Sequence, residues 1–443
     1  MTIDTASSPT ISALPVIRRA ALWLCLLAPF FYLTYGIANW LASQRAHVPN
    51  LAFDWEGAIP FYAWTIVPYW SINAFYALSL FINDTSTAVD RLAKRYLMAQ
   101  VVAVTCFIAF PLTAIFTRPE TSGLPGFMFA VLGGFDKPFN QAPSLHIALL
   151  VIIWDHLRRK LPGGVRQVWH VWCFLIGVSV LTTYQHHFID IPTGALLGLF
   201  ALWFFPHGAP SPLAGFHFTT NEKARRLGRA YAVGACLLLL LTVSGVFLTG
   251  YALLFLWPAL ALAIVSVGYF GAGPPVFQKA ADGKVTLASH WLLMPYRFGA
   301  RLNIRYWTRA LPARIEITDG VFLGRFPTGP ELSGIATVID LTGELIALRS
   351  TTGTVWKSFP ALDLVAPPDE TLAAAAGAIE ASRPNGPVLV CCALGFQRSA
   401  ATVMHWLVAT SRSPNRYAAL ELLKSKGRPV HLPAMVTNPK GSA

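Results

Sequence analysis

The sequence has few charged residues for its length. Only 12% of its 443 residues are Asp, Glu, Lys or Arg, whereas 54% are hydrophobic. This excludes an ordinary soluble globular protein, in which about 25% of residues are charged. Acidic residues are the scarcer kind, since 21 of them oppose 34 basic residues and leave a formal net charge of +13. We therefore expect much of the chain to lie in a membrane.

The six cysteines form no spacing that is typical of a disulfide framework or a zinc site. Cys25, Cys106, Cys173 and Cys236 lie within apolar runs, where a thiol packs as a small hydrophobic group. The sequence also lacks an internal repeat, and no small-residue cleavage site follows its first apolar segment. These absences predict a reducing environment for the soluble part and a retained first helix instead of a cleaved signal peptide.

Long apolar runs recur through the first 272 residues. A helix needs about 20 apolar residues to cross the hydrocarbon core of a bilayer. Basic residues gather in every second loop, so the positive-inside rule predicts that both termini are cytoplasmic. We therefore predict an integral membrane protein, located in a bacterial inner membrane. Its eight candidate spans are 18–41, 61–83, 96–116, 144–160, 166–186, 189–206, 229–249 and 251–272.

The composition changes at about residue 273. Residues 273–311 are basic and aromatic, which predicts a linker that lies on the anionic inner leaflet, with a plain solvated linker as the alternative. From about residue 313 the periodicity is that of strands and helices in a soluble domain. The predicted fold is a polytopic α-helical membrane domain of about eight transmembrane helices followed by a soluble α/β domain. Its parts are a polar tail (1–14), a six-helix membrane domain (15–206), a cytoplasmic loop with two further helices (207–272), the linker (273–311), the soluble domain (312–435) and a tail (436–443).

The segment VLVCCALGFQRSAATV, residues 388–403, joins a predicted buried strand to a predicted helix. Backbone N–H groups converge on an anion at such a turn. Gly395 would let the backbone approach closely, and Arg398 could clamp two phosphate oxygens. The same positive field favours a thiolate, so Cys392 could attack phosphorus. Ser399 could donate a hydrogen bond to the sulfur and help it leave.

Five residues separate Cys392 from the arginine that follows it. Over about 313–435 the chain resembles the dual-specificity branch of the protein tyrosine phosphatase superfamily, whose signature is His-Cys-x5-Arg-Ser/Thr. The resemblance implies a cysteine-phosphatase fold and a general-acid aspartate upstream of the nucleophile. Asp363 lies 29 residues before Cys392, and Asp369 is the alternative. The chain departs from the signature at Cys391, which stands in place of the histidine.

The membrane half carries ionisable residues at the predicted outer ends of its helices, and such residues are functional candidates. His186 and Asp190 are four residues apart, so on a helix the carboxylate could hold one ring nitrogen while the other attacks phosphorus. His146 could protonate the leaving oxygen, and Arg118 could clamp the phosphoryl group. The stretches concerned are FTRPETSG (116–123), APSLHIAL (142–149) and SVLTTYQHHFIDIPTGALLG (179–198).

These stretches resemble the type 2 phosphatidic acid phosphatase superfamily over roughly 50–206. That family carries Lys-x6-Arg-Pro, Pro-Ser-Gly-His and Ser-Arg-x5-His-x3-Asp. Leu145 replaces the glycine before His146, which makes the chain more similar to the inositol phosphorylceramide and sphingomyelin synthase branch. Pro111 and Val180 stand where the superfamily has a lysine and an arginine. Two of its phosphate ligands are therefore missing.

The second resemblance implies a reaction that moves a phosphoryl group or a phospho-headgroup between lipids. It implies His146, His186 and Asp190 as catalytic residues and Arg118 and Ser144 as phosphate-binding residues.

Together the two sites predict a bifunctional membrane enzyme of phospholipid metabolism. The outer site would be a lipid phosphatase or headgroup phosphotransferase, and the cytoplasmic site a phosphatase for a phosphomonoester such as a lipid phosphate. Each site supplies its own nucleophile and phosphate clamp, so we expect no metal and no cofactor. Expected partners are membrane lipid substrates and the anionic inner leaflet, not nucleic acid. The alternatives are a membrane-anchored scaffold that binds phosphorylated partners without catalysis and, less favoured, a transporter.

Overall fold

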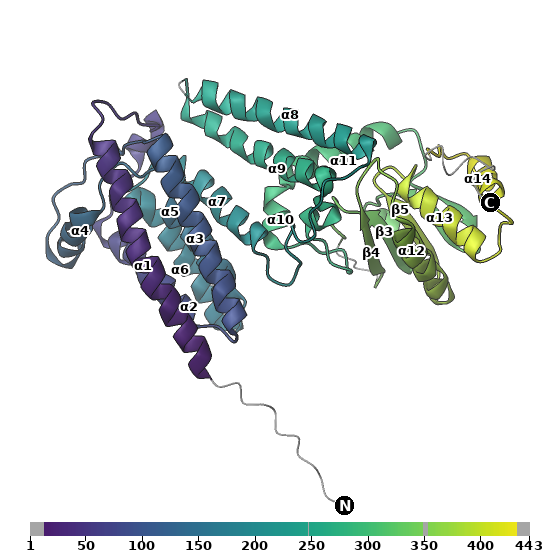
Figure 1. The fold of residues 1–443 in the computed structure, drawn as a ribbon, viewed down its shortest axis with the longest axis horizontal. Helices are drawn as coiled ribbons and strands as arrows, with labels where there is room; N and C mark the ends of the chain where they lie inside the picture. The colour runs from purple at the N-terminus through teal and green to yellow at the C-terminus, as the bar shows by residue number, and fades with distance from the viewer. Residues whose placement is uncertain (1–12, 247, 349–352, 432–443) are drawn as a thin grey trace, which may run out of the picture. The chain divides into compact units, whose positions relative to one another are not determined.

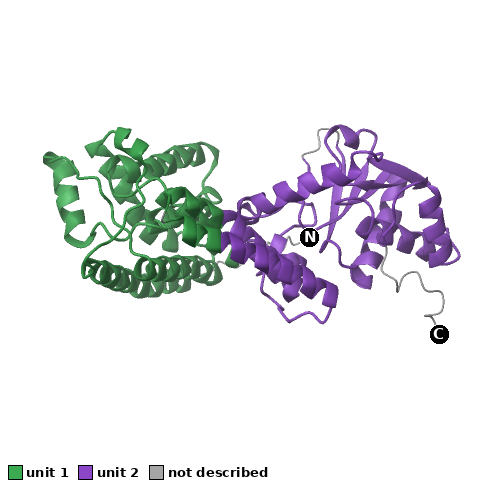
Figure 2. Ribbon diagram, turned by 90° about the horizontal axis from the view of Figure 1, so that it is seen from above, with its two compact units in different colours: residues 1–205, 240–256 green, residues 206–239, 257–443 purple. Residues whose placement is uncertain are grey.

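The computed structural model describes residues 13–246, 248–348 and 353–431 (Figure 1). The chain forms two compact units (Figure 2). Unit 1 comprises residues 1–205 and 240–256, and unit 2 comprises residues 206–239 and 257–443. Each unit holds one of the two groups of candidate residues.

Each of the eight predicted apolar segments contains a helix. Among the described residues, five helices are long and apolar enough to cross a membrane: Leu14–Ser43, Ser86–Ala109, Gly163–Thr182, Glu222–Gly245 and Gly250–Ala272. The helical elements are α1 (Ala13–Ser43), α2 (Ile66–Phe81), α3 (Ser86–Ala109), α5 (Leu145–Arg158), α6 (Gly163–Thr182), α7 (Asp190–Phe204), α8 (Glu222–Gly245) and α9 (Leu256–Val267), the last continued by a π-helical turn, Gly268–Ala272. Helices α2, α5, α7 and α9 have 16, 14, 15 and 12 residues. Helix α9 reaches the length of a membrane span only together with the helical turns on either side of it, over Gly250–Ala272. An additional apolar helix, α4 (Gly123–Phe135), lies in a region that we had predicted to be a loop.

Two glycines allow α7 to pack closely against α5. A Cβ atom at Gly194 would lie 2.4 Å from the carbonyl oxygen of Ser144, and one at Gly198 would lie 2.7 Å from that of Ala148. Small residues four apart permit this kind of backbone approach between membrane helices. The approach brings the first turn of α7 beside the first turn of α5, where the candidate histidines lie.

Unit 2 contains a five-stranded sheet in the order β1-β2-β5-β3-β4. Strand β1 is antiparallel to β2, and the remaining neighbours are parallel. The strands are β1 (Arg314–Thr318), β2 (Val321–Arg325), β3 (Thr337–Thr342), β4 (Val355–Ala361) and β5 (Val388–Cys392). Helix α12 (Asp369–Ser382) lies between β4 and β5, and α13 (Arg398–Ala409) and α14 (Arg416–Ser425) follow β5. The predicted strand and helix around the cysteines are therefore present, with β5 at the centre of the sheet.

The two faces of β5 belong to different cores. Cys392 lies in the cluster formed with α12, α13 and α14, which cover one face of the sheet (Figure 1). Cys391 lies in the cluster on the other face, together with Ile304 of helix α11 (Met294–Thr308). Because successive side chains of a strand point to opposite faces, the two adjacent cysteines have different surroundings.

Residues 273–311 are packed against the sheet, which differs from the predicted linker. The Lys279 ammonium lies 2.5 Å from a carboxylate oxygen of Asp340, and both side chains are fully buried. Two backbone hydrogen bonds join the same segment to β4 and to the chain after β3: Ser358 N to Ala281 O, and Ala347 N to Gly283 O. Such a buried ion pair is costly to break, so the segment is part of the folded unit.

The outer face of α11 remains exposed. Phe298, Leu302, Tyr306 and Trp307 are each about half exposed or more. Contact of this face with an anionic membrane surface stays a prediction.

Candidate functional sites

The loop between β5 and α13 wraps around the sulfur of Cys392. The Cys392 Sγ atom accepts a hydrogen bond from the backbone N–H of Gly395 at 3.3 Å and another from the Ser399 hydroxyl at 3.2 Å. Cys392 is 3% exposed and lines a cavity of about 530 Å³. Two donors aimed at one sulfur stabilise negative charge on it.

The backbone of this loop is held from outside by Arg428. Its buried guanidinium donates to the carbonyl oxygens of Leu394 at 2.9 Å and Gly395 at 3.3 Å. Gly395 has a φ of +79°, and a Cβ atom there would lie 2.5 Å from Arg428 Nη2 and 2.6 Å from the Gly324 carbonyl oxygen. Both the left-handed conformation and the close approach therefore require glycine at this position.

Arg398 is fully buried at the start of α13 and is held by two carboxylates. Its Nη1 and Nη2 atoms donate to the two oxygens of Glu344 at 2.9 and 2.7 Å, and Nη2 also donates to Asp363 Oδ1 at 2.7 Å. Although burial opposes it, the nearby carboxylates raise the pKa of Arg398 above its ordinary value. Burial of Glu344 favours a higher pKa for its carboxyl, but the Arg398 cation outweighs this effect and lowers the pKa below its ordinary value. The Nε atom of Arg398 is buried without a hydrogen-bond partner among the described residues.

The two candidate acids differ in position. Asp363 lies in the loop after β4, lines the Cys392 cavity and contacts Arg398. Its side chain is 28% exposed, and burial raises the pKa of its carboxyl above the ordinary value, although the Arg398 cation opposes this. Asp369 is an exposed residue at the first position of α12. The geometry therefore favours Asp363 over Asp369.

Cys391 is unsuited to act as the nucleophile. It is fully buried, faces the opposite core and does not appear among the described residues that line the cavity. Burial and the neighbouring Asp340 carboxylate raise the pKa of its thiol well above the ordinary value. A neutral thiol with no access to solvent cannot easily attack a phosphate.

In unit 1, His186 lies between a carboxylate and a hydroxyl. Its Nδ1 atom is 3.1 Å from Asp190 Oδ2, and its Nε2 atom is 3.2 Å from Ser144 Oγ. Asp190 is the first residue of α7 and also accepts a hydrogen bond from the backbone N–H of His187. Ser144 precedes α5 and its hydroxyl caps that helix by accepting from Ile147 N. The carboxylate thus orients the imidazole and leaves Nε2 directed at the start of α5.

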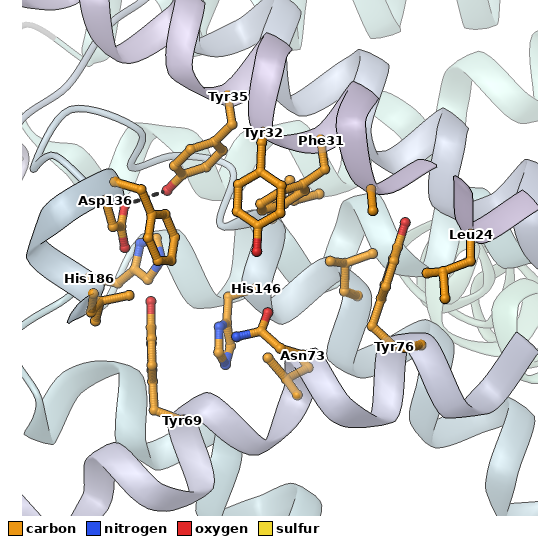
Figure 3. Close-up of a pocket in the computed structure, with 17 residues that line it drawn as sticks. Leu24, Phe31, Tyr32, Tyr35, Tyr69, Asn73, Tyr76, Asp136, His146 and His186 are labelled. Atoms are coloured by element: carbon orange, nitrogen blue, oxygen red, sulfur yellow. Dashed lines mark hydrogen bonds between the residues drawn. The ribbon is translucent and has the colours of Figure 1, made fainter. Parts of the chain in front are cut away.

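His146 and His186 line one cavity of about 200 Å³ (Figure 3). The His146 ring stacks on Tyr69 with a centroid distance of 4.2 Å, and its Nε2 atom has no hydrogen-bond partner among the described residues. The cavity also contains Asp136, which accepts a hydrogen bond from the Tyr35 hydroxyl at 2.9 Å. Sequence analysis did not identify Tyr35, Tyr69 and Asp136 as cavity residues, because no local pattern joins them to the histidines.

Arg118 is not among the described residues that line this cavity. The side-chain amide of Gln185 bridges Arg118 and Asp136. In the orientation that pairs both amide groups, the amide oxygen accepts a hydrogen bond from Arg118 Nη1 at 3.2 Å, and the amide nitrogen donates one to Asp136 Oδ2 at 3.2 Å. The arginine also lies over the Phe129 ring. Arg118 therefore reaches the site through Gln185, and direct phosphate binding by Arg118 stays a prediction.

The adjacent His187 has a separate set of partners. Its Nδ1 atom is 3.1 Å from Glu56 Oε2, and its Nε2 atom accepts from the backbone N–H of Ile115 at 3.2 Å. His187 is not among the described residues that line the cavity, and its contacts join the loop to Glu56 and Ile115. His186 lines the cavity with His146, and its assignment as the nucleophile stays a prediction.

Within the described ranges, no group of three or more His, Cys, Asp or Glu side chains is arranged to hold a metal ion.

No family model matches this sequence, and no curated protein matches it. Structure comparison finds similarity to tyrosine and dual-specificity phosphatases. The crystal structure of Tk-PTP in the active form is 24% identical, with 27% of this chain and 87% of that chain covered and a TM-score of 0.25.

Two further similarities are to mammalian proteins. A mouse putative dual specificity phosphatase complexed with zinc tungstate is 23% identical, with 29% and 83% covered and a TM-score of 0.25. Human DUSP28 is 21% identical, with 30% and 88% covered and a TM-score of 0.23. Because these TM-scores are far below 0.5, the similarities establish neither a family nor an activity for this chain.

Proposed function

We propose that unit 2 is a cysteine-dependent phosphatase that hydrolyses a phosphomonoester. The observation that carries this proposal is that the Cys392 sulfur accepts two hydrogen bonds, one from Gly395 N–H and one from the Ser399 hydroxyl. The sulfur lies at the end of β5, and one of its two donors, Ser399, belongs to the first turn of α13. Arg398 lies beside the loop with an unpaired buried Nε–H, a donor that an oxyanion could satisfy.

The reaction would proceed in two displacements. The Cys392 thiolate attacks phosphorus, an S–P bond forms, the bond to the leaving oxygen breaks, and the Asp363 carboxylic acid gives its proton to that oxygen. Water then attacks phosphorus, the Asp363 carboxylate takes its proton, and the S–P bond breaks to release phosphate. Arg398 would exchange its hydrogen bond with Asp363 for one with a phosphate oxygen, which frees Asp363 for proton transfer.

The test compares the two adjacent cysteines in the full-length protein in detergent. Cys392→Ser should abolish hydrolysis of p-nitrophenyl phosphate, whereas Cys391→Ser should keep measurable activity. If the wild-type protein binds a phosphate ester but releases no inorganic phosphate from it, the result would favour the scaffold alternative. Loss of activity in Cys391→Ser alone would overturn the assignment of the nucleophile.

We also propose a second phosphoryl-transfer site in unit 1, acting on membrane lipids. It is supported by the 3.1 Å contact between His186 and Asp190 and by the shared cavity of His186 and His146. The His186 Nε2 atom would attack phosphorus once Ser144 moves from it, and His146 would protonate the leaving oxygen. A lipid hydroxyl or water would then take the phosphoryl group from His186.

This second proposal is tested by replacing His186 and His187 separately. Replacing His186 by Ala should stop formation of a labelled product from headgroup-labelled phospholipid, while His187→Ala should alter folding more than chemistry. Product formation that persists in a folded His186→Ala protein would contradict the role of His186.

We further propose that the chain is an integral protein of a bacterial inner membrane with cytoplasmic termini. The five helices that are long and apolar enough to cross a membrane support this proposal. The alternating basic loops would place the Cys392 site at the cytoplasmic side and the His186 site at the outer side.

A further inference from the structure

The cavity above Cys392 is lined by residues from outside the α/β domain. Besides Cys392 and Asp363, its lining includes Asn221 and Lys223 at the start of α8. Its volume of about 530 Å³ is in the range of cavities that hold ligands much larger than phosphate. The substrate therefore has room for a sizeable group beyond the phosphate, and α8 contacts that group.

The start of α8 combines a fixed position with positive charge. Asn221 caps the helix, since its side-chain oxygen accepts the N–H of Ala224 at 3.0 Å. Lys223 is followed by exposed arginines at 225, 226 and 229. The rest of the 24-residue helix is apolar, and its most apolar stretch of 18 residues has a mean hydropathy of 1.7. A basic cluster at the end of such a helix is typical of the level of anionic lipid headgroups.

The turn after α9, the next apolar helix, is hydrogen-bonded to the loop that carries Asp363. Tyr269, in the π-helical turn after α9, donates from its hydroxyl to the backbone carbonyl oxygen of Asp363 at 2.9 Å. The Tyr269 ring stacks on Tyr231 of α8, with a centroid distance of 5.4 Å. The acid loop is thus attached to two helices that are long and apolar enough to cross a membrane.

The lining between Asp363 and the loop is apolar. Leu364, Val365, Ala366 and Phe396 all line the cavity, and Leu364 is 43% exposed. A substrate that fits has a phosphate at one end, an apolar surface along the wall and an anionic group that faces the Lys223 ammonium. This combination describes the headgroup region of a phospholipid better than it describes a soluble phosphate ester.

Resting on the phosphatase function above, we propose that the Cys392 site takes a membrane phospholipid whose headgroup ends in a phosphomonoester. Arg398 and the loop N–H groups bind that terminal phosphate. Lys223 binds a second anionic group of the same headgroup, the phosphodiester nearer the glycerol. Residues at the ends of α8 and α9 therefore complete a site whose nucleophile lies in the α/β domain.

The experiment measures kcat/KM of the full-length protein in lipid nanodiscs with four probes. These are a phosphatidylinositol monophosphate, phosphatidic acid, a phosphotyrosine peptide and p-nitrophenyl phosphate. The first carries both a phosphodiester and a terminal monoester, whereas phosphatidic acid lacks the second phosphate. We expect the first probe to have the highest kcat/KM of the four.

Lys223→Ala tests the role of the lysine. We expect kcat/KM for the phosphatidylinositol monophosphate to fall by at least about tenfold more than for p-nitrophenyl phosphate or phosphatidic acid, and Lys223→Arg to recover most of the loss. Arg225→Ala is the matched control, since Arg225 lies elsewhere on α8 and does not line the cavity. It should leave all four values close to those of the wild type.

The outcomes separate the two proposals. If no probe is hydrolysed in a Cys392-dependent way, the phosphatase function itself is wrong. If p-nitrophenyl phosphate is hydrolysed but the peptide is the best substrate, or Lys223→Ala lowers all values equally, the phosphatase stands and the lipid inference is overturned. Tyr269→Phe gives a second measurement: it should lower kcat more than KM for the lipid, because Tyr269 positions the acid loop and does not contact the substrate.

Discussion

Glu344 holds both terminal nitrogens of Arg398, with donor–acceptor distances of 2.9 and 2.7 Å. The guanidinium is fully buried, and Glu344 itself is 2% exposed. Because a charge at this depth needs a partner, Glu344 fixes the plane of the guanidinium that would clamp the phosphate. Glu344 is thus a positioning residue for Arg398.

Replacing Glu344 by Gln should weaken the clamp. The amide keeps one acceptor but loses the charge and one of the two parallel hydrogen bonds, so Arg398 is free to turn. We expect kcat/KM for p-nitrophenyl phosphate to fall by about 10²-fold, the loss that a displacement of about 1 Å can cause. The inhibition constant of vanadate, a phosphate analogue, should rise in parallel. Glu421→Gln is the control, because Glu421 forms an exposed pair with Lys424, and a folded Glu344→Gln protein with wild-type values would exclude this role.

Replacing Asp363 by Asn should remove the alkaline limb of the pH–rate profile. A general acid works while protonated, so activity falls as the pH rises through its pKa. Burial raises the pKa of Asp363, which places this fall at a higher pH than for an ordinary carboxyl group with a pKa of about 3.9. The loss in kcat should be larger for alkyl than for aryl phosphates, whose leaving group needs less protonation. Asp369→Asn should keep the profile, and the reverse result would make Asp369 the acid.

Replacing Gly194 by Ala should damage the unit 1 site. The new Cβ atom would lie 2.4 Å from the Ser144 carbonyl oxygen, so α7 has to move away from α5 and carry Asp190 with it. We expect lipid headgroup transfer to be lost and the unfolding free energy of unit 1 to fall by about 1–3 kcal/mol. Gly36→Ala in α1 is the matched control, because nothing lies within 4 Å of its new Cβ atom. Equal activity of the two variants would show that the close approach is not needed.

The two sites should lie on opposite sides of the membrane. Ser122 and Ser425 are exposed residues, of units 1 and 2 respectively. In a background without native thiols, an impermeant maleimide should label Ser122→Cys on intact cells and Ser425→Cys only after permeabilisation. Labelling of both from outside would contradict the proposed topology.

Local patterns in the sequence were enough to locate eight apolar helices and the cysteine loop. The apolar runs are too long to be turns. Strand β5 ends at Cys392 and helix α13 begins at Arg398, the two residues on either side of the loop. Helix α4 was missed because its 13 residues are too few to cross a bilayer. Residues 273–311 were assigned to a linker because their charges suggested exposure, whereas Lys279 is buried against Asp340.

The partners of the site residues were not predictable in the same way. Glu56 pairs with His187 across 131 positions, and Glu344 pairs with Arg398 across 54. No periodicity links residues so far apart, because their contact depends on how the helices and strands pack. Asp136 could not be identified from the sequence for the same reason, because its hydrogen bond with Tyr35 forms only when α1 lies beside the end of α4.

The central claim is that Cys392 carries the phosphoryl group during turnover. Full-length Cys391→Ser protein, which keeps one cysteine in the loop, is mixed with p-nitrophenyl phosphate and quenched in acid within a single turnover. Mass spectrometry of the loop peptide should then show one added phosphate on Cys392, and none in a protein that also carries Cys392→Ser. Turnover that continues without phosphate on Cys392 would contradict the account.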